Sequence, residues 1–135
     1  LAQQIEDTAV KAGSNIVLEN IYFVGGSPEF LHSSYPTVDE LVEVMKSHPK
    51  LVIRVEGHIC CLAGDEDGFN IRSEKYDLSE GRAKAVMEHL VANGIAPERV
   101  SYIGYGHSRP LYPYPEKTEA ERVANRRVEI KIISK

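Results

Sequence analysis

The sequence has little that would cross-link it, carry it through a membrane or bind it to a nucleic acid. Only two of its 135 residues are cysteines, and these two, Cys60 and Cys61, are adjacent. Adjacent cysteines cannot join distant parts of a chain, which excludes a disulfide framework. The apolar runs are short, as at residues 51–53, so no segment is long enough to span a bilayer. Asp and Glu (20) outnumber Lys and Arg (16), and a net charge of −4 argues against a nucleic-acid binder, which needs a basic face.

The remaining composition is that of one small acidic globular domain. Hydrophobic residues make up 42% and charged residues 27% of the chain, which is enough to bury a core. The first residue is Leu1 rather than Met, which we interpret as the start of a fragment, a processed form or an expression product. A signal peptide or membrane anchor upstream of Leu1 would be invisible in this sequence.

Four β-rich stretches alternate with helical patterns along the chain. We predict strands at residues 16–23, 51–57, 100–105 and 127–133, helices at residues 37–48 and 78–93, and a helical turn at residues 119–124. The order β-α-β-α-β-(α)-β predicts an α+β fold, with a mixed β-sheet of about four strands and the helices packed on one face. Residues 1–14 are polar and weakly patterned, so we predict an N-terminal segment or linker before a domain at residues 15–135.

Local signals mark the ends of the two predicted helices. Thr37 and Glu40 have the spacing of a capping box, and Pro36 before them suits a helix entrance. Pro49 closes the first helix, and Gly94 follows the second where helices commonly end. The polar connection at residues 58–76 is long for a small domain, and such stretches are more often functional or mobile than idle.

Arg82 is the most informative single residue. At helical spacing it lies in line with Leu78, Val86 and Leu90, so an arginine interrupts an apolar stripe. An unpaired buried charge is costly, and the planar guanidinium suits two-pronged binding of a carboxylate. Two interpretations stay open: a ligand contact, or an internal ion pair with an Asp or Glu.

Two further arginines, Arg126 and Arg127, lie at the start of the last predicted strand. Strand alternation predicts that one side chain points inward and the other outward. The pair is either a second anion contact, or one arginine pairs with a helix end while the other is solvated. The residues alone favour the second interpretation.

His58, Cys60 and Cys61 resemble a fragment of a metal site, because His and Cys are the usual ligands of zinc. Three ligands so close in sequence suit a tetrahedral site poorly, and of the other histidines only His107 precedes a turn able to approach them. We interpret the cysteines as two small side chains at a strand end, and expect neither a metal nor another cofactor. The chain has no paired-carboxylate motif and no Gly-x-Ser-x-Gly elbow, so no enzyme is predicted.

Taken together, these segments resemble a known family. The resemblance covers about residues 15 to 133 and rests on the residues around 20–23, 41–49, 55–58, 78–86, 94–95, 104–106 and 125–130. Its most specific parts are Leu-Ser-x-x-Arg-Ala-x-x-Val from Leu78 and Asn-Arg-Arg-Val-Glu from Asn125. The chain is identified as a member of the OmpA-like C-terminal domains, the peptidoglycan-binding modules of Gram-negative outer-membrane and flagellar-motor proteins.

The resemblance implies a pocket for the diaminopimelate residue of the stem peptide. In the family, an aspartate after a Gly-His-Thr segment takes the amine and the helix arginine takes the carboxylate. The helix arginine here is Arg82, and Arg127 resembles a supporting arginine near the pocket. The implied location is the periplasmic side of the outer membrane, with membrane contact only through an unseen upstream segment and with envelope proteins as possible partners.

The chain departs from the family pattern at three places. Ile59 and Cys60 stand where the family has Thr and Asp, and a thiol with an ordinary pKa of ~8.5 is a poor partner for an ammonium. Lys75 stands where the family has an asparagine, and the loop up to Leu78 is longer than usual. Losing one charge-assisted contact costs about 1.5–3 kcal/mol. Three outcomes stay open for such a pocket: weaker binding, binding of a different stem-peptide residue, or a replacement carboxylate from the loop, such as Asp65, Asp67 or Asp77.

Three functions follow as expectations. The first is a non-catalytic module that tethers an outer-membrane protein to peptidoglycan. The alternative is an OmpA-like scaffold or protein-interaction domain that has lost this binding, as the residues at positions 60 and 75 suggest. The third, and least expected, is a metal or redox site at His58, Cys60 and Cys61.

Overall fold

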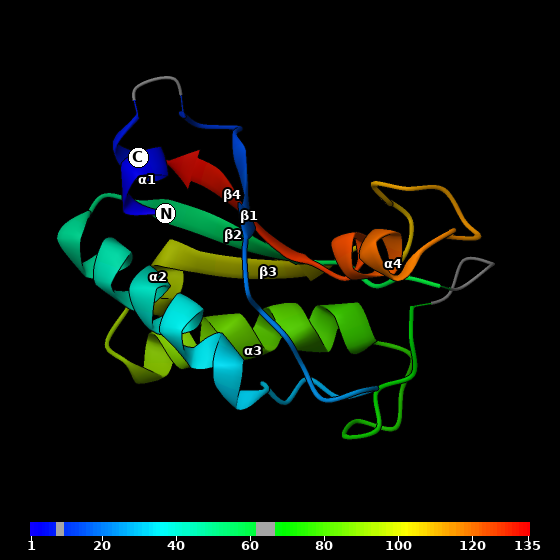
Figure 1. Ribbon diagram of the computed structural model, residues 1–135. Helices are drawn as coiled ribbons and strands as arrows, with labels where there is room; N and C mark the ends of the chain where they lie inside the picture. The colour runs from blue at the N-terminus through cyan, green and yellow to red at the C-terminus, as the bar shows by residue number, and fades with distance from the viewer. Residues whose placement is uncertain (8–9, 62–66) are drawn as a thin grey trace.

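The computed structural model has a four-stranded mixed sheet at its centre (Figure 1). It describes residues 1–7, 10–61 and 67–135. The strands are β1 (Asn15–Leu18), β2 (Val52–Gly57), β3 (Val100–Gly104) and β4 (Val128–Ser134), in the spatial order β1-β4-β2-β3. β4 runs antiparallel to both β1 and β2, whereas β2 and β3 are parallel. The predicted α+β fold with a mixed sheet is confirmed.

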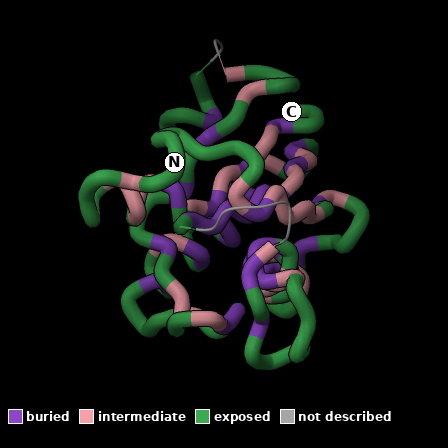
Figure 2. Tube along the Cα trace, turned by 90° about the vertical axis from the view of Figure 1, so that its right-hand side faces the viewer, coloured by how far each residue is buried: buried purple, intermediate pink, exposed green. Residues whose placement is uncertain are grey.

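Two long helices, α2 (Tyr35–Ser47) and α3 (Leu78–Ala92), pack against each other on one face of the sheet (Figure 1). The remaining helical elements are α1 (Ala2–Glu6), η1 (His32–Ser34), η2 (Pro97–Arg99) and α4 (Glu119–Asn125). The inward side chains of the strands, such as Ile53 and Ile130, are fully buried against the long helices. Figure 2 shows these buried segments at the centre of the molecule, surrounded by exposed turns.

The N-terminal segment contributes to this core. Residues 2–6 form α1, and Ile5 is fully buried with the residues of the sheet and α2. The amino group of Leu1 lies 3.5 Å from Glu40 on α2. Leu1 and Ile5 therefore make contacts that a free linker would not make. Within the described residues, no helix has the length and apolar character needed to cross a membrane.

The predicted capping box of Thr37 and Glu40 is wrong. Helix α2 begins earlier, at Tyr35, with Pro36 in its first turn and Ser34 as an N-cap that makes no side-chain hydrogen bond. Proline fits the first turn because it lacks the N–H that would be unpaired there. Thr37 therefore lies inside the helix, where its hydroxyl donates to the carbonyl of Glu19 at 2.9 Å.

The first strand is shorter than predicted. It ends at Leu18, and Asn20 adopts a left-handed backbone conformation (φ 63°) that stops the extended chain. Beyond this bend only Phe23 pairs again, as an isolated bridge to Phe30. The bend directs residues 21–25 away from the sheet and toward α3, where they form one wall of the site described below.

Two glycines allow α3 to approach the sheet closely. Gly57 and Gly104 are partners in the register between β2 and β3. A Cβ atom on Gly57 would lie 2.1 Å from the carbonyl oxygen of Ser79, and one on Gly104 would lie 2.3 Å from the backbone nitrogen of Glu80. The missing side chains let the first turn of α3 rest on the ends of these strands, which sets the position of Arg82 one turn further on.

Candidate ligand-binding site

Arg82 is buried on α3, with 9% of its surface exposed. Its Nε donates to the carbonyl of Ser27 at 3.0 Å, and its Nη2 donates to the carbonyl of Val24 at 3.2 Å. The guanidinium carbon lies 4.9 Å from the centre of the Phe23 ring, within the range of a cation–π contact. All three partners belong to the segment that follows the bend after β1.

No carboxylate among the described residues forms an ion pair with Arg82, so the internal ion pair that the sequence left open is not found there. Burial, and secondarily the nearby charge of Arg126, lower the pKa of Arg82 to about 10, while Asp67 opposes this shift. The guanidinium nonetheless remains protonated at neutral pH. It is a buried cation stabilised by main-chain carbonyls and an aromatic ring, without a neutralising anion.

A cavity of about 260 Å³ opens beside this guanidinium. It is lined by Ile21, Tyr22, Phe23, Gly25, Leu31, Arg82, Val123 and Arg126. A narrower cavity of about 10 Å³ adjoins the same residues and includes His58 and Arg127. The lining of the larger cavity contains two arginines and no carboxylate, which favours an anionic group as its ligand. We call it the Arg82 cavity.

The two arginines after Asn125 diverge, but strand alternation does not explain this, because both precede β4, which begins at Val128, and Arg126 is the C-cap of α4. The Arg127 side chain is 8% exposed, pairs with Glu129 and donates to the carbonyl of Arg109 at 3.0 Å. The Arg126 side chain is 42% exposed and lies 2.9 Å from Glu119 on α4. Arg126 was not among the predicted site residues, although it borders the Arg82 cavity more directly than Arg127 does. The sequence signal for it was the Asn-Arg-Arg motif itself, which does not indicate which arginine faces the cavity.

His58 is buried beside the sheet, with 5% of its surface exposed. Its ring stacks on Tyr105 at 5.4 Å, and neither ring nitrogen has a hydrogen-bond partner among the described residues. Burial, with a further contribution from the charge of Arg127, lowers the pKa of His58 to about 4. His58 is therefore neutral near pH 7.

The expectation of a free thiol at Cys60 is wrong. Cys60 and Cys61 form a disulfide with each other (S–S 2.02 Å). A disulfide between the two neighbours was the redox form of the least expected interpretation of these positions, and Cys61 adopts a left-handed backbone conformation (φ 72°) at this link. Cys60 and Ile59 line a separate small cavity, and neither belongs to the lining of the Arg82 cavity.

Two of the three expected replacement carboxylates, Asp67 and Asp77, have other partners. Asp67 caps the start of α3, accepting from the backbone N–H of Ser79 at 3.0 Å and from its hydroxyl at 2.6 Å. Asp77 accepts from the Ser73 hydroxyl at 2.6 Å, and Asp65 lies outside the described residues. Lys75 is exposed and pairs by a backbone bridge with Asn70.

Asn70 is a polar residue that the sequence analysis missed. It is 3% exposed, and its side-chain oxygen accepts from the backbone N–H of Arg72 at 2.9 Å. A Cβ atom added to Gly81 would lie 2.7 Å from its side-chain nitrogen, so this amide packs directly against the residue before Arg82. A buried amide thus supports this turn of α3 from position 70, whereas the resemblance placed it at position 75.

The structure separates the three weak metal candidates into two groups. His58 lies with Glu56 and Glu129, whereas Cys60 and Cys61 lie with Glu116. In the first group both carboxylates already bind arginines, Glu56 with Arg54 at 2.9 Å and Glu129 with Arg127. These cations compete with a metal ion for the same oxygens.

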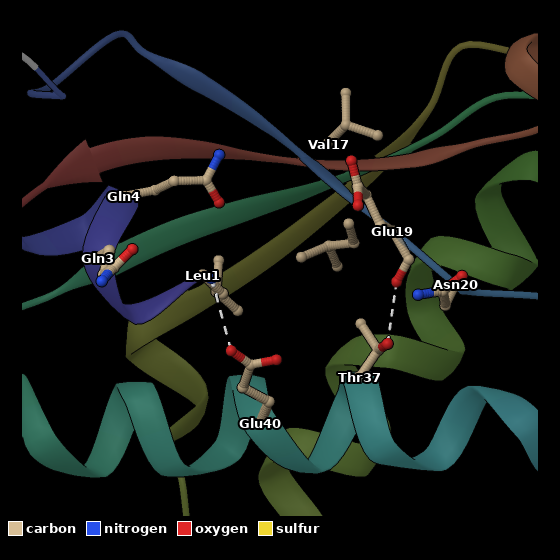
Figure 3. A pocket seen from close by; sticks show the side chains of 9 residues that line it. Leu1, Gln3, Gln4, Val17, Glu19, Asn20, Thr37 and Glu40 are labelled. Atoms are coloured by element: carbon tan, nitrogen blue, oxygen red, sulfur yellow. Dashed lines mark hydrogen bonds and ion pairs between the residues drawn. The ribbon is translucent and has the colours of Figure 1, made fainter.

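A larger cavity, of about 430 Å³, lies between α1, the end of β1 and α2 (Figure 3). Glu19 and Glu40 contribute carboxylates to its lining, and no Lys, Arg or His side chain does so. Figure 3 shows the Glu40 carboxylate directed at the Leu1 amino group and Thr37 at the backbone of Glu19. The cavity therefore differs in charge from the Arg82 cavity and suits an anion poorly.

Comparison with known proteins identifies the family. The OmpA family pattern matches residues 22–126. Outer membrane porin F of Pseudomonas fluorescens is 38% identical over 100 residues, which covers 74% of this chain and 28% of the porin. The peptidoglycan-associated lipoprotein of Pseudomonas putida is 30% identical over 102 residues, covering 76% of this chain and 60% of the lipoprotein. The chain thus spans less than two thirds of the length of either relative.

Solved structures agree on the fold. The periplasmic domain of Helicobacter pylori MotB superposes with a TM-score of 0.69 at 19% identity, covering 89% of this chain and 74% of that domain. The peptidoglycan-associated lipoprotein of Burkholderia pseudomallei superposes with a TM-score of 0.66 at 20% identity, covering 83% of this chain and 87% of the lipoprotein. The sheet, the helix arginine and the family pattern define an OmpA-like domain. The chain belongs to the OmpA family.

Proposed function

We propose that this chain is a non-catalytic peptidoglycan-binding module of the cell envelope, and that the Arg82 cavity holds a carboxylate of the stem-peptide diamino acid. The observation that carries the proposal is the buried guanidinium of Arg82, which borders an open cavity and has no anionic partner among the described residues. Relatives named as outer membrane porins and peptidoglycan-associated lipoproteins support the ligand class and the location.

The geometry around Arg82 suits a carboxylate in particular. Nε and Nη2 already donate to main-chain carbonyls, which orients the guanidinium plane. Arg126 in the same lining adds a second positive charge, and the charges of Arg126 and Arg82 disfavour each other. An anion between them relieves this repulsion, and hydrogen bonds to charged groups contribute about 1.5–3 kcal/mol.

The lining of the cavity offers no anionic partner for an ammonium group. Its residues include no carboxylate, and position 60 is a disulfide sulfur instead of the aspartate that the resemblance implies. We therefore assign to this site the carboxylate half of a zwitterionic ligand. Binding then depends on the free carboxylate of the diamino acid far more than on its amine.

Calorimetric titration with defined muropeptides tests this assignment. Amidation of the side-chain carboxylate of diaminopimelate is expected to weaken binding about 10- to 100-fold, because a charge-assisted contact to Arg82 is lost. Acetylation of the neighbouring amine is expected to change affinity less than ~3-fold, because no assigned contact is lost. The reverse order of sensitivity would refute the assignment.

A scaffold function is the second candidate, favoured by the disulfide at position 60 and the exposed Lys75. On that account the domain keeps the fold and binds an envelope protein instead of the cell wall. One experiment distinguishes the two functions: saturable muropeptide binding that is lost in Arg82→Ala excludes the scaffold function.

A further inference from the structure

The Cys60–Cys61 disulfide lies among side chains that are typical metal ligands. The two sulfur atoms and a carboxylate oxygen of Glu116 all lie within 4.8 Å of one another. Glu116 accepts from the backbone N–H of Cys61 at 3.0 Å, which holds its carboxylate at the turn. His107 lines the same small cavity, and its Nε2 is buried without a hydrogen-bond partner among the described residues.

The small cavity lined by Cys60, Cys61, His107 and Glu116 has room for a single ion. Its volume is about 20 Å³, and a site of about 10–15 Å³ or more is enough for one water-sized sphere. Pro110, Tyr112 and Tyr114 form much of the remaining wall. A small surface cavity with sulfur, carboxylate and imidazole donors in its lining fits the ligand preferences of Zn²⁺, which takes four ligands in tetrahedral geometry.

We propose that reduction of the Cys60–Cys61 disulfide converts this cavity into a Zn²⁺ site, held by both thiolates, Glu116 and His107. In the oxidised chain the sulfurs are bonded to each other and are not thiolate ligands, so the site is closed to zinc. Zn²⁺ can therefore bind only after the disulfide is reduced. This inference does not rest on the proposed peptidoglycan binding, since none of its four ligands lines the Arg82 cavity.

The reduction is a thiol–disulfide exchange with a dithiol reductant. A thiolate of the reductant attacks one sulfur, the Cys60–Cys61 bond breaks, and a mixed disulfide forms. The second thiol of the reductant then releases that sulfur, so the reductant leaves as a disulfide and the chain gains two electrons and two protons as two thiols. Binding of Zn²⁺ displaces the two thiol protons, and rotation about the Cα–Cβ bonds moves the sulfurs to about 3.8 Å apart, as Zn–S distances of about 2.3 Å require.

The other two ligands are suited to this role in the folded chain. The Glu116 carboxylate is held in place by two donors, the side-chain N–H of Asn125 at 3.2 Å and the backbone N–H of Cys61 at 3.0 Å, both of which donate to its Oε2. His107 is placed next to the cysteine segment because the carbonyl of the preceding Gly106 accepts from the backbone N–H of Ile59 at 2.9 Å.

The test titrates Co²⁺ and then Zn²⁺ into the whole chain, once oxidised and once reduced with a phosphine that is afterwards removed without air. The reduced chain is expected to bind one metal ion, with the ligand-field absorption of tetrahedral Co²⁺ and a thiolate-to-cobalt charge-transfer band that Zn²⁺ abolishes. The oxidised chain, with the same sequence, is expected to bind none. Equal binding by both forms, or no stoichiometric binding by the reduced form, would overturn the proposal.

Variants assign the ligands. Cys61→Ser is expected to weaken the charge-transfer band of bound Co²⁺ to about half, because one thiolate remains, and His107→Ala and Glu116→Gln are each expected to weaken Zn²⁺ binding about tenfold or more. His32→Ala, which removes a histidine on η1, is the matched control and is expected to change nothing. Circular dichroism checks that each reduced variant is folded. Unchanged affinity in folded His107→Ala and Glu116→Gln would show binding by thiols alone, and would refute the four-ligand site.

Discussion

Arg82 and His58 are both buried side chains that can carry a positive charge, and both lie near one end of the sheet. At neutral pH Arg82 is charged and His58 is neutral. Arg82 stays charged because its pKa, although burial lowers it to about 10, remains well above neutral pH, and two main-chain carbonyls accept its hydrogen bonds. His58 has no such acceptors among the described residues, and burial lowers its pKa to about 4. The place of Arg82 was predictable from helical spacing. Its carbonyl partners were not, because they lie 55 and 58 residues away in sequence and reach Arg82 only through the bend after β1.

The neutral His58 predicts a pH dependence of stability. Its pKa in the folded chain lies below the ordinary value of 6.5, so at pH values between about 6.5 and 4 the unfolded chain binds a proton that the folded chain does not. The contribution to stability is complete above about pH 6.5 and is lost as the pH falls toward 4. Allowing for solvent screening, the loss amounts to about 2 kcal/mol.

Urea unfolding between pH 7 and pH 4 measures this effect. His58→Phe keeps a ring to stack on Tyr105 and cannot titrate, so its free energy of unfolding is expected to change less over this range than that of the native chain. The difference in slope between the two plots of unfolding free energy against pH measures the contribution of His58. A constant change in stability caused by the substitution does not affect this difference. Parallel curves would show that His58 is protonated in the folded chain as easily as in the unfolded chain.

At the scale of the elements, the contact between α3 and the strands β2 and β3 is the one that positions the site. The sequence predicted both long helices and all four strands, because their apolar periods are regular. It missed where β1 ends and where α2 begins, since a left-handed Asn20 and a proline in the first turn determine those ends. The capping of α3 by Asp67 was also missed, because the carboxylate acts across a loop from 12 residues before Ser79.

Gly104→Ala tests the close approach of α3. The new Cβ would lie 2.3 Å from the backbone nitrogen of Glu80, a distance at which the helix backbone must shift. We expect a loss of about 1–3 kcal/mol in the free energy of unfolding, because overpacking against backbone cannot be relieved by rotating a side chain. Chemical denaturation measures it, and Gly25→Ala, where an added Cβ meets no atom within 4 Å, is the control. Equal effects of the two substitutions would argue against tight packing of α3 on the strands.

At the scale of the whole molecule, the family was predictable because its motifs are specific in sequence and lie at the structural contacts just described. The site was predictable only in part. Of the predicted ligand-binding residues, Arg82 lines the Arg82 cavity and Arg127 lines the narrower cavity beside it, whereas Ile59, Cys60, Lys75 and Asp77 line neither. Those positions belong to a long loop, and the partners of a loop side chain depend on tertiary contacts that periodicity does not encode.

Co-sedimentation of the purified chain with protein-free sacculi tests the central claim most directly, with Arg82→Ala compared against Lys84→Ala. Both substitutions remove one positive charge from α3, but Lys84 is exposed and is not part of the Arg82 cavity. We expect saturable binding of the native chain and of Lys84→Ala to sacculi. We expect the affinity of a folded Arg82→Ala to be lower by about 10-fold or more. Undiminished binding of Arg82→Ala, or no binding of the native chain, would contradict the central claim.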